Sequence, residues 1–347
     1  MPAHDLLDDL RDAAERTGLA AIGVAPAETF DDTLAVLESR KAEGLHGGMA
    51  FTYRDPRRST DPTRILPGAR SIVVGALGYA AGAVSRPTDG VPLGRVARYA
   101  IADTYGALRS ALDEVAGVLE AAGHRTRVVL DDNALVDRAA AHRAGIGWFG
   151  RNANLLVPGH GSWVVLGSIV TDADLPPSSV VADGCGSCRR CLDGCPTGAI
   201  IAPGVVDARR CLAWLVQADG GFPEEHRIAL GDRVYGCDDC QEVCPPARRG
   251  PEAQVDVDPS AAWVDLLWML RASDEELLER LGRWYIARRD PRNLRRNALL
   301  ALANTADPHS VEVRDEVDRF RRSDDSMLAE HAAWAWNRLD DRVDAPS

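Results

Sequence analysis

The sequence predicts a mixed fold of the α+β or α/β class in three parts: an α/β domain at residues 1–180, a cysteine-rich domain at 181–250 and a helical domain at 251–347. Three observations predict it. Strand and helix patterns alternate in the first part, all eight cysteines lie in the second, and amphipathic helices follow one another in the third. The 347 residues are enough for two or three domains, each with its own core.

The first part alternates between the two periodicities of helix and strand. Apolar spacing predicts helices at 5–17, 31–43, 103–122 and 134–144, and β-branched runs predict strands at 19–27, 70–79, 125–132 and 163–172. Residues 80–95, rich in Gly and Pro, are predicted to form a loop. No G-x-G-x-x-G motif lies between a strand and a helix, so the sequence does not support a nicotinamide-binding Rossmann domain.

The third part predicts helices at 261–270, 273–281, 292–304, 308–322 and 325–338, with no strand pattern among them. Paired short helices of this length are typical of a small α-solenoid of HEAT-like repeats. A plain helical bundle fits the pattern nearly as well.

Composition and charge exclude several classes of protein. Lys41 is the only lysine, and Ala-Glu follows it, so a G-x-x-x-x-G-K-[ST] phosphate loop is absent. No apolar run approaches the roughly 20 residues of a membrane span. The acidic, amphipathic N-terminus lacks the features of a secretory signal, so we expect a cytoplasmic protein. The net charge of −12 argues against generic nucleic-acid binding but leaves room for a local basic face.

The cysteines form two related motifs. The first motif, C-x₂-C-x₂-C-x₃-C-P, is the run of bacterial two-cluster ferredoxins, and its members are Cys185, Cys188, Cys191 and Cys195. The second motif has the same order with its first spacing stretched to 25 residues, and its members are Cys211, Cys237, Cys240 and Cys244. In a reducing compartment such a tight group of cysteines points to metal rather than to disulfides.

The spacing predicts two [4Fe–4S] clusters with crossed ligands. Three thiolates at short spacing wrap one cubane, and the fourth, before proline, reaches the other cluster. The first cluster is then held by Cys185, Cys188, Cys191 and Cys244, and the second by Cys211, Cys237, Cys240 and Cys195. Two zinc sites or free thiols are the alternatives, but zinc usually uses pairs of C-x₂-C knuckles. Two clusters in line form an electron relay, which indicates a redox enzyme or an electron carrier.

Further motifs resemble the epoxyqueuosine reductase family. They are LPGARS (66–71), ARYA (97–100), AGIGWFGRNANLL (144–156), GSWVVLG (161–167), PTGAI (196–200), DARRC (207–211), YGCDDCQEVCP (235–245), RRNALLALAN (295–304) and HAAWAW (331–336). The resemblance covers nearly the whole chain in order, and iron–sulfur binding alone does not explain several of these motifs.

The resemblance implies an oxidoreductase that converts epoxyqueuosine to queuosine at the wobble position of tRNA, using cobalamin and two [4Fe–4S] clusters. It implies tRNA as a partner, an unidentified electron donor such as flavodoxin or ferredoxin, no membrane partner, and a monomer. Reducing an epoxide to an alkene needs two electrons, two protons and an acid for the departing oxygen, and this set of groups suits that chemistry.

The family's site residues carry over by motif. Asp131, in VVLDD, matches the proton donor, and burial beside an apolar corrin face should raise its pKa. Asp132 or Asn133 fits the N-cap of the helix at 134–144 better. The resemblance places cobalamin contacts at Arg54, Ala100, Asp131, Asn152, Ala213, Cys237, Asp238, Asp239 and Cys240.

The sequence departs from the family's usual residues at Gly106, Ala213 and Pro246, which belong to the cofactor and substrate region. These departures leave room for a second function, reduction of a small molecule in the manner of reductive dehalogenases. A third function, electron transfer without catalysis, would need a chain that binds only clusters.

A basic segment at 280–296 bears on the tRNA question. The segment contains seven arginines and one acid, Asp290, with Trp284 and Tyr285 among them. On an acidic protein such a segment predicts local phosphate binding. The expected tRNA contacts are Arg288, Arg289, Arg292 and Arg295. A solvated helix surface is the alternative interpretation.

Overall fold

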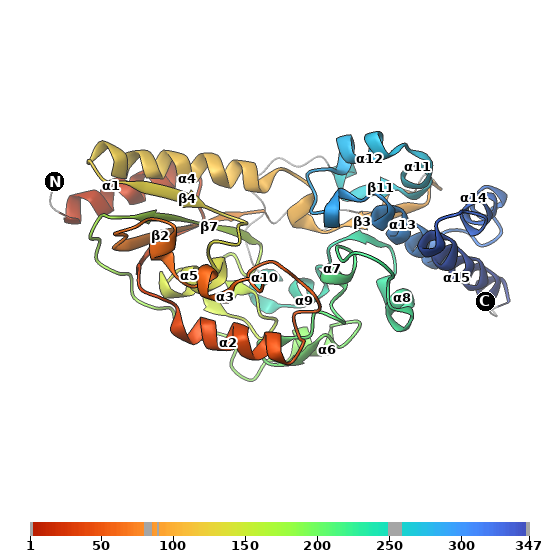
Figure 1. Ribbon diagram of the computed structural model, residues 1–347, viewed down its shortest axis with the longest axis horizontal. Helices are drawn as coiled ribbons and strands as arrows, with labels where there is room; N and C mark the ends of the chain where they lie inside the picture. The colour runs from red at the N-terminus through yellow and green to blue at the C-terminus, as the bar shows by residue number, and fades with distance from the viewer. Residues whose placement is uncertain (1–2, 80–84, 89, 249–258, 345–347) are drawn as a thin grey trace. The chain divides into compact units, whose positions relative to one another are not determined.

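The computed structural model describes residues 3–79, 85–88, 90–248 and 259–344, and the chain divides into two compact units (Figure 1). The first unit comprises Met1–Gly82, Asp103–Ala208 and Asp239–Asp256. The second unit comprises Ala83–Ala102, Arg209–Asp238 and Val257–Ser347. Each unit is assembled from three separate stretches, so its core depends on residues that lie far apart in the sequence.

The first unit contains one large sheet, several helices and short elements around the cysteines. Its helices are α1 (Ala3–Arg16), α2 (Asp31–Ala42), α3 (Pro56–Ser59), η1 (Pro62–Arg64), α4 (Thr104–Ala121), α5 (Asp137–Arg143), α6 (Arg190–Asp193), α9 (Asp239–Glu242) and α10 (Pro245–Arg248). Its strands are β1 (Ala21–Pro26), β2 (Ser71–Gly78), β4 (Thr126–Val129), β5 (Trp148–Phe149), β6 (Leu155–Leu156), β7 (Val164–Thr171), β8 (Ile200–Ala202) and β9 (Val205–Val206).

The large sheet has the order β1-β2-β7-β4, and every neighbouring pair is antiparallel. The alternation of strands and helices had favoured an α/β sheet, but antiparallel pairing makes this unit α+β. The α/β expectation is wrong because strands that follow one another in the sequence pair in opposite directions, as β1 and β2 do.

Two paired glycines let a helix approach this sheet closely. Gly75 on β2 lies opposite Gly167 on β7. A Cβ atom at either position would come within 3 Å of the Leu112 side chain, which projects from α4. Helices α1 and α4 therefore cover this face of the sheet, and α5 covers the other (Figure 1). The α5 side contains a separate apolar core with Phe30 and Ile72, both wholly buried.

The second unit contains a three-stranded sheet followed by helices. Its strands are β3 (Leu93–Val96), β10 (Arg233–Tyr235) and β11 (Trp263–Asp265), in the order β10-β3-β11. Its helices are η2 (Arg98–Ala100), α7 (Leu212–Leu215), α8 (Glu224–Leu230), η3 (Pro259–Ala262), α11 (Leu266–Arg271), α12 (Asp274–Leu281), η4 (Ala287–Arg289), α13 (Arg292–Thr305), α14 (Val311–Arg321) and α15 (Ser326–Val343).

Two sequence predictions are wrong in this unit. Strand β3 begins at Leu93, inside the predicted loop at 80–95; residues 80–84 and 89 of that loop lie outside the described part of the chain. The predicted helix at 261–270 starts only at Leu266, because Asp265 caps it by accepting the N–H groups of Leu267 and Trp268. The residues before that cap are extended, and they pair with β3.

The other predicted helices of the third part are present with shifted ends. Helix α13 is almost entirely buried, and the apolar faces of α11, α14 and α15 pack around it in one core. No helix in the described ranges is both long and apolar enough to cross a membrane.

Candidate functional site

The first cysteine motif is folded as a series of tight turns. The N–H of Cys188 donates to the Cys185 carbonyl at 3.1 Å, and Cys191 lies on the single turn of α6. The N–H of Cys195 donates to the Leu192 carbonyl at 3.3 Å. The C-x₂-C and C-x₃-C spacings are therefore the spacings of successive turns, which keep the four side chains within one short segment.

The structure brings Cys244 into the group formed by the first motif. Burial is the main cause that raises the pKa of Cys191, followed by the charge of Cys244 and, more weakly, that of Cys185. Burial also raises the pKa of Cys244; an N–H from Ala247 opposes that shift, and the charges of Cys185 and Cys188 add to it. The raised pKa values of Cys191 and Cys244 show that thiolate charges lie close together here, which fits an anionic ligand set whose negative charge a metal group offsets.

Cys195 has a different environment from the other members of its motif. Its Sγ atom accepts the N–H of Ala199 at 3.2 Å and lies 3.8 Å from the hydroxyl oxygen of Thr197. Hydrogen bonds to a ligating sulfur are one of the means by which a protein sets the potential of an iron–sulfur cluster. The Cys195 sulfur is therefore held in place by the backbone and a hydroxyl of the residues that follow it.

The donor set of this region consists of thiols. No disulfide joins any of the eight cysteines, all of which lie in described residues. In a cubane each thiolate binds a different iron atom, and soft thiolate ligands suit iron–sulfur clusters, so these residues fit such a group.

The second motif starts at helix α7 and ends at α10. Cys211 is the N-cap residue of α7, and its carbonyl accepts the N–H groups of Trp214 and Leu215 at 2.9 Å each. Cys237 follows β10 directly after the turn at Gly236, which has φ 71°. Cys240 lies on α9, and Asn152 donates a 3.4 Å hydrogen bond to its carbonyl.

Asp131 lies in a loop after β4 with a left-handed backbone, φ 49°. Its side chain is exposed to solvent. Desolvation by the surrounding protein atoms, and then the charge of Asp132, raise its pKa above the ordinary value. The raised pKa agrees with the direction predicted from the sequence.

The Asp131 loop is anchored from residues far away in the sequence. The Asn133 side-chain oxygen accepts the N–H of Thr52 at 2.9 Å, and its carbonyl accepts the hydroxyl of Ser59 at 2.6 Å. The N–H of Val136 in turn donates to the Ser59 carbonyl at 3.0 Å. These bonds hold the backbone after Asp131, and the pairing of β4 with β7 holds the residues up to Val129 before it, so the unfavourable φ at Asp131 is maintained by its surroundings.

The expectation that Asp132 caps the following helix is wrong. Its carboxylate accepts the N–H of Ala134 at 2.7 Å, which closes a local turn. Helix α5 begins only at Asp137, and its N-cap residue, Val136, makes no side-chain capping bond. An Asp side chain that bonds a nearby backbone N–H in this way stabilises a turn, and it thereby competes with helix formation.

Sequence reasoning missed a second carboxyl group, Asp137. Its pKa is raised well above the ordinary value, first by burial and then by the charge of Asp131, with a smaller contribution from Asp132. Arg138 and the Asp131 N–H oppose the shift. A carboxyl group six residues after a candidate acid, at the start of the next helix, is the sequence signal that would have drawn attention to it.

The predicted cobalamin contacts are distributed over both units. In the first unit Arg54 is exposed and Asn152 is buried; Asp239 and Cys240 lie on α9. In the second unit Ala100 is buried at the end of η2, Ala213 lies on α7, and Cys237 and Asp238 follow β10. The buried carboxylate of Asp238 accepts the N–H of Arg98 at 2.8 Å.

Local packing accounts for one departure from the family. A Cβ atom at Gly106 would lie 2.3 Å from the carboxylate of Asp103, which caps α4 by accepting the Gly106 N–H. Any side chain at this position would displace the cap, so the glycine and the capping aspartate belong together. Pro246, another departure, lies in the first turn of α10, a position that proline favours.

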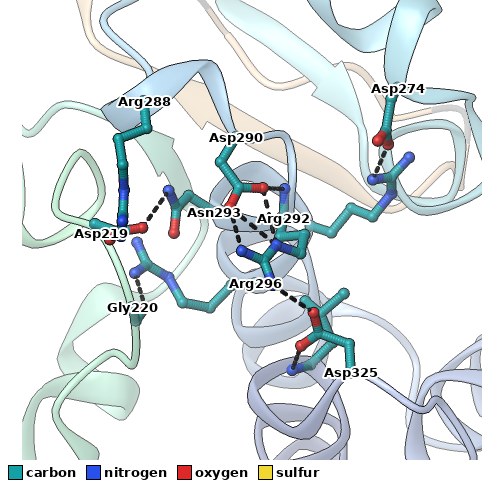
Figure 2. Close-up of polar contacts among 11 residues, drawn as sticks. Asp219, Gly220, Asp274, Arg288, Asp290, Arg292, Asn293, Arg296 and Asp325 are labelled. Carbon is teal, nitrogen blue, oxygen red and sulfur yellow. Dashed lines mark hydrogen bonds and ion pairs between the residues drawn. The ribbon is translucent and has the colours of Figure 1, made fainter.

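The arginines of the basic segment are paired with acids from elsewhere in the chain (Figure 2). Arg288 pairs with Asp219, and Arg292 pairs with Asp290 and, at 2.9 Å, with Asp325. The prediction that Asp290 alone offsets the seven arginines is therefore wrong. Asp219, in the loop before α8, and Asp325, the N-cap residue of α15, also pair with arginines of the segment.

The remaining arginines of the segment differ in exposure. The Arg295 side chain is 12 % exposed and pairs with Asp274, whereas Arg288 is 75 % exposed. Arg289 is exposed and donates to the Gly282 carbonyl at 3.1 Å. Trp284 stacks on Tyr235 in the core with a centroid distance of 4.5 Å, so Tyr285 is the aromatic residue of the pair that faces solvent.

Comparison with known proteins agrees with this chemistry. The cysteine set defines an iron–sulfur protein, and residues 184–247 match the family model of the 4Fe-4S double cluster binding domain. The chain is 34 % identical to the epoxyqueuosine reductase of Bacillus subtilis over 98 % of its own length and 89 % of that protein. It therefore belongs to the epoxyqueuosine reductase family and is an oxidoreductase that holds two [4Fe–4S] clusters.

Solved structures give the same result for the fold. A crystal structure of epoxyqueuosine reductase with an epoxyqueuosine-modified tRNA-Tyr stem loop matches with a TM-score of 0.89 and 33 % identity, covering 97 % of this chain and 91 % of that one. A Bacillus subtilis structure, whose catalytic aspartate loop is swung out of the active site, matches with a TM-score of 0.88 and the same identity and coverage.

Proposed function

We propose that this protein reduces epoxyqueuosine to queuosine in the tRNA anticodon, with Asp131 as proton donor. The observation that carries the proposal is the anchored Asp131 loop, in a chain of this family, with a raised carboxyl pKa. Removing the epoxide oxygen consumes two electrons and two protons, forms the alkene and releases water. A carboxyl group whose pKa is raised keeps its proton to a higher pH than an ordinary aspartate, and it can give that proton to the departing oxygen.

The cysteines supply the electrons of this reaction one at a time. The proposed ligand sets are Cys185, Cys188, Cys191 and Cys244 for one cluster and Cys211, Cys237, Cys240 and Cys195 for the other. The interactions among Cys185, Cys191 and Cys244 support the first set. We propose a small reduced electron carrier, such as flavodoxin or ferredoxin, as the donor, and a monomeric enzyme that works where tRNA is modified, in the cytoplasm.

Cobalamin is the proposed second cofactor, and it would supply a low-potential cobalt centre for attack on carbon. The residues proposed to hold it fit a large amide-rich macrocycle. Ala100 and Ala213 are small, and Arg54 is exposed with no ion pair among the described residues. The Asn152 side chain donates to the Cys240 carbonyl, and the Asp238 carboxylate accepts the Arg98 N–H. Both side chains are therefore already bonded to backbone groups. Arg54 is therefore the proposed polar contact.

The helical segment from α11 to α15, proposed as HEAT-like repeats in a domain at 251–347, would bind the tRNA. Arg288 and Arg289 both have φ 54° and both are exposed. Two successive left-handed arginines each cost roughly 1–2 kcal/mol and persist only where other contacts hold them. We propose these two residues, with exposed Tyr285 beside them in sequence, as the phosphate-binding part of the segment.

The test of the function is direct. Anaerobically reconstituted protein, with cobalamin and a chemical reductant, is incubated with tRNA bearing epoxyqueuosine, and the nucleosides are analysed by mass spectrometry. We expect loss of one oxygen atom from the modified base in the wild type and in Asp132→Asn, but not in Asp131→Asn. Unchanged tRNA with an active small-molecule reductase would favour the dehalogenase-like alternative.

The test of the tRNA surface uses matched arginines. The double substitution Arg288→Gln with Arg289→Gln should weaken tRNA binding and flatten its salt dependence, because two phosphate contacts are lost. The control is Arg295→Gln, whose side chain is largely buried against Asp274. That control should lower the free energy of unfolding and leave the salt dependence unchanged.

A further inference from the structure

Arg296 is a charged side chain wholly inside the protein. It lies on α13 with 0 % exposure and is the largest of the fully buried side chains among the described residues. Burial, and then the charge of Arg227, lower its pKa to about 10, so the guanidinium is still protonated at neutral pH. Its Cζ atom lies 5.7 Å from the centroid of the Phe222 ring.

The partners of this guanidinium are all neutral oxygens. Nη1 donates to the carbonyls of Ala218, at 2.9 Å, and of Gly220, as Figure 2 shows for Gly220. Nη2 donates to the Leu215 carbonyl and to the Asn297 side-chain oxygen, each at 2.9 Å. Within the described ranges no carboxylate pairs with Arg296, whereas the nearby buried Arg227 pairs with Glu330 at 2.8 Å. A buried cation without an acid is costly unless another negative group lies near it.

Arg296 binds carbonyls at the end of α7, whose N-cap residue is Cys211, and in the loop that follows this helix. Leu215 is the last residue of α7, and its N–H donates to the carbonyl of Cys211, the N-cap residue, at 2.9 Å. Asn297, next to Arg296, donates to the Val216 carbonyl at 2.7 Å and to the Val234 carbonyl at 3.0 Å. The two side chains thus fix the end of α7.

The same pair of residues reaches the segment of a second cysteine. Val234 lies on β10, three residues before Cys237. Cys237 also packs against an apolar cluster that includes Leu215 of α7 and Leu300 of α13. The segments of Cys211 and Cys237 are therefore both tied to α13 through hydrogen bonds and apolar contacts in one unit.

We propose that Arg296 is a positioning residue for the cluster held by Cys211 and Cys237, and that its charge favours the reduced state of that cluster. A [4Fe–4S] cluster with four thiolates is an anion, and reduction adds one more negative charge. A fixed positive charge in the interior lowers the energy of the reduced form more than that of the oxidised form. The proposal rests on the cluster assignment within the proposed function and not on the tRNA substrate.

The experiment compares Arg296→Gln, Arg296→Lys and Arg314→Gln. The Gln variant at 296 removes the charge, and the Lys variant keeps it. Arg314, also on the helical segment, is 23 % exposed and already pairs with Asp340, so its Gln variant is the control. Iron content and the reduction of each cluster are measured in the full-length, anaerobically reconstituted protein, by iron analysis and by electron paramagnetic resonance during redox titration.

We expect Arg296→Gln to lower the reduced-to-oxidised ratio of one cluster about tenfold at a fixed potential, which is 59 mV for a one-electron couple. The affected signal should be the one that Cys211→Ser removes. Arg296→Lys and Arg314→Gln should titrate like the wild type. Loss of about half the iron in Arg296→Gln, restored in Arg296→Lys, would support the positioning role. Eight irons and unchanged titration of both clusters in Arg296→Gln would overturn the proposal.

A second variant tests the charge if Arg296→Gln does not fold. Asn297→Asp places a carboxylate where the Asn297 oxygen now accepts two bonds from Arg296, so it neutralises the guanidinium without removing it. At a fixed potential, the affected cluster of Asn297→Asp should have a lower reduced-to-oxidised ratio than in the wild type, as in Arg296→Gln. An unchanged titration in a folded Asn297→Asp would contradict the charge effect. Since no readout involves tRNA, failure of the proposed substrate would leave these results unaffected.

Discussion

Replacing Asp131 by asparagine should abolish most turnover while leaving the fold in place. Asp131 has φ 49°, in the left-handed region that asparagine tolerates better than most other residues with a side chain. The anchoring bonds of Asn133 do not involve the Asp131 side chain, so the loop keeps its supports. Asparagine has no carboxylic proton, and general acid catalysis typically contributes roughly 10²–10⁴-fold, so turnover should fall by about that factor.

A comparison with alanine separates chemistry from conformation. Asp131→Ala also lacks the proton, and a left-handed backbone at a residue with a Cβ atom costs roughly 1–2 kcal/mol unless its side chain bonds locally. Both variants should lose turnover, but only the alanine variant should show a lower thermal unfolding temperature. Single-turnover conversion of tRNA, thermal unfolding, and iron and cobalamin content are the measurements.

The pH dependence gives an independent check on Asp131. Its folded pKa is raised, first by burial and then by Asp132, and only the protonated carboxyl group can donate. The wild-type rate should therefore be full below that pKa and fall as the pH rises through it, and the residual rate of Asp131→Asn should not show this fall. Near-normal turnover in Asp131→Asn, with loss in Asp132→Asn, would mean that the wrong carboxylate has been assigned.

Three further predictions follow from the same geometry. Because the folded pKa of Asp137 is raised above its unfolded value, its carboxylate destabilises the fold. This cost is absent at pH 3, grows as the pH rises above the ordinary carboxyl pKa and is complete once the pH exceeds the folded pKa, so Asp137→Asn should unfold at a higher temperature than the wild type at pH 8 but not at pH 3. Cys244→Ser should lose the same cluster signal as Cys185→Ser, as measured by electron paramagnetic resonance, and loss of the other signal would contradict the crossed ligands. The double Gln variant of Arg288 and Arg289 should reduce the slope of tRNA affinity against salt by about two, as measured by binding titration.

The sequence was most informative where spacing alone determines geometry. The cysteine intervals are the lengths of single turns, so C-x₂-C predicted local structure and chemistry together. Long amphipathic helices such as α4 and α13 were predicted to within one residue at each end, because their apolar periodicity extends over many residues. Asp131 was found through family motifs, and its raised pKa follows from burial that no local pattern reveals.

The sequence was least informative where contacts come from distant segments. Acids on other loops pair with the arginines of the basic segment, and counting charges within that segment could not find Asp219 or Asp325. Helix α11 starts later than its apolar run because the short strand β11 pairs with β3. Arg296 resembles its exposed neighbours in sequence, and only the fold shows that it is buried.

The grouping of Cys244 with the first motif also affects the stability of the fold when the cluster is lost. A cluster held by Cys185 and Cys244 would act as a crosslink that closes a loop of 59 residues (244 − 185). For a disulfide, closing a loop of that size restricts the unfolded chain by roughly 4 kcal/mol, a large fraction of a domain's stability. Exposure to oxygen that destroys the cluster would then release this restraint and loosen the chain that carries it. Loss of the cluster should therefore make the segment between Cys185 and Cys244 open more readily, and so more accessible to proteases.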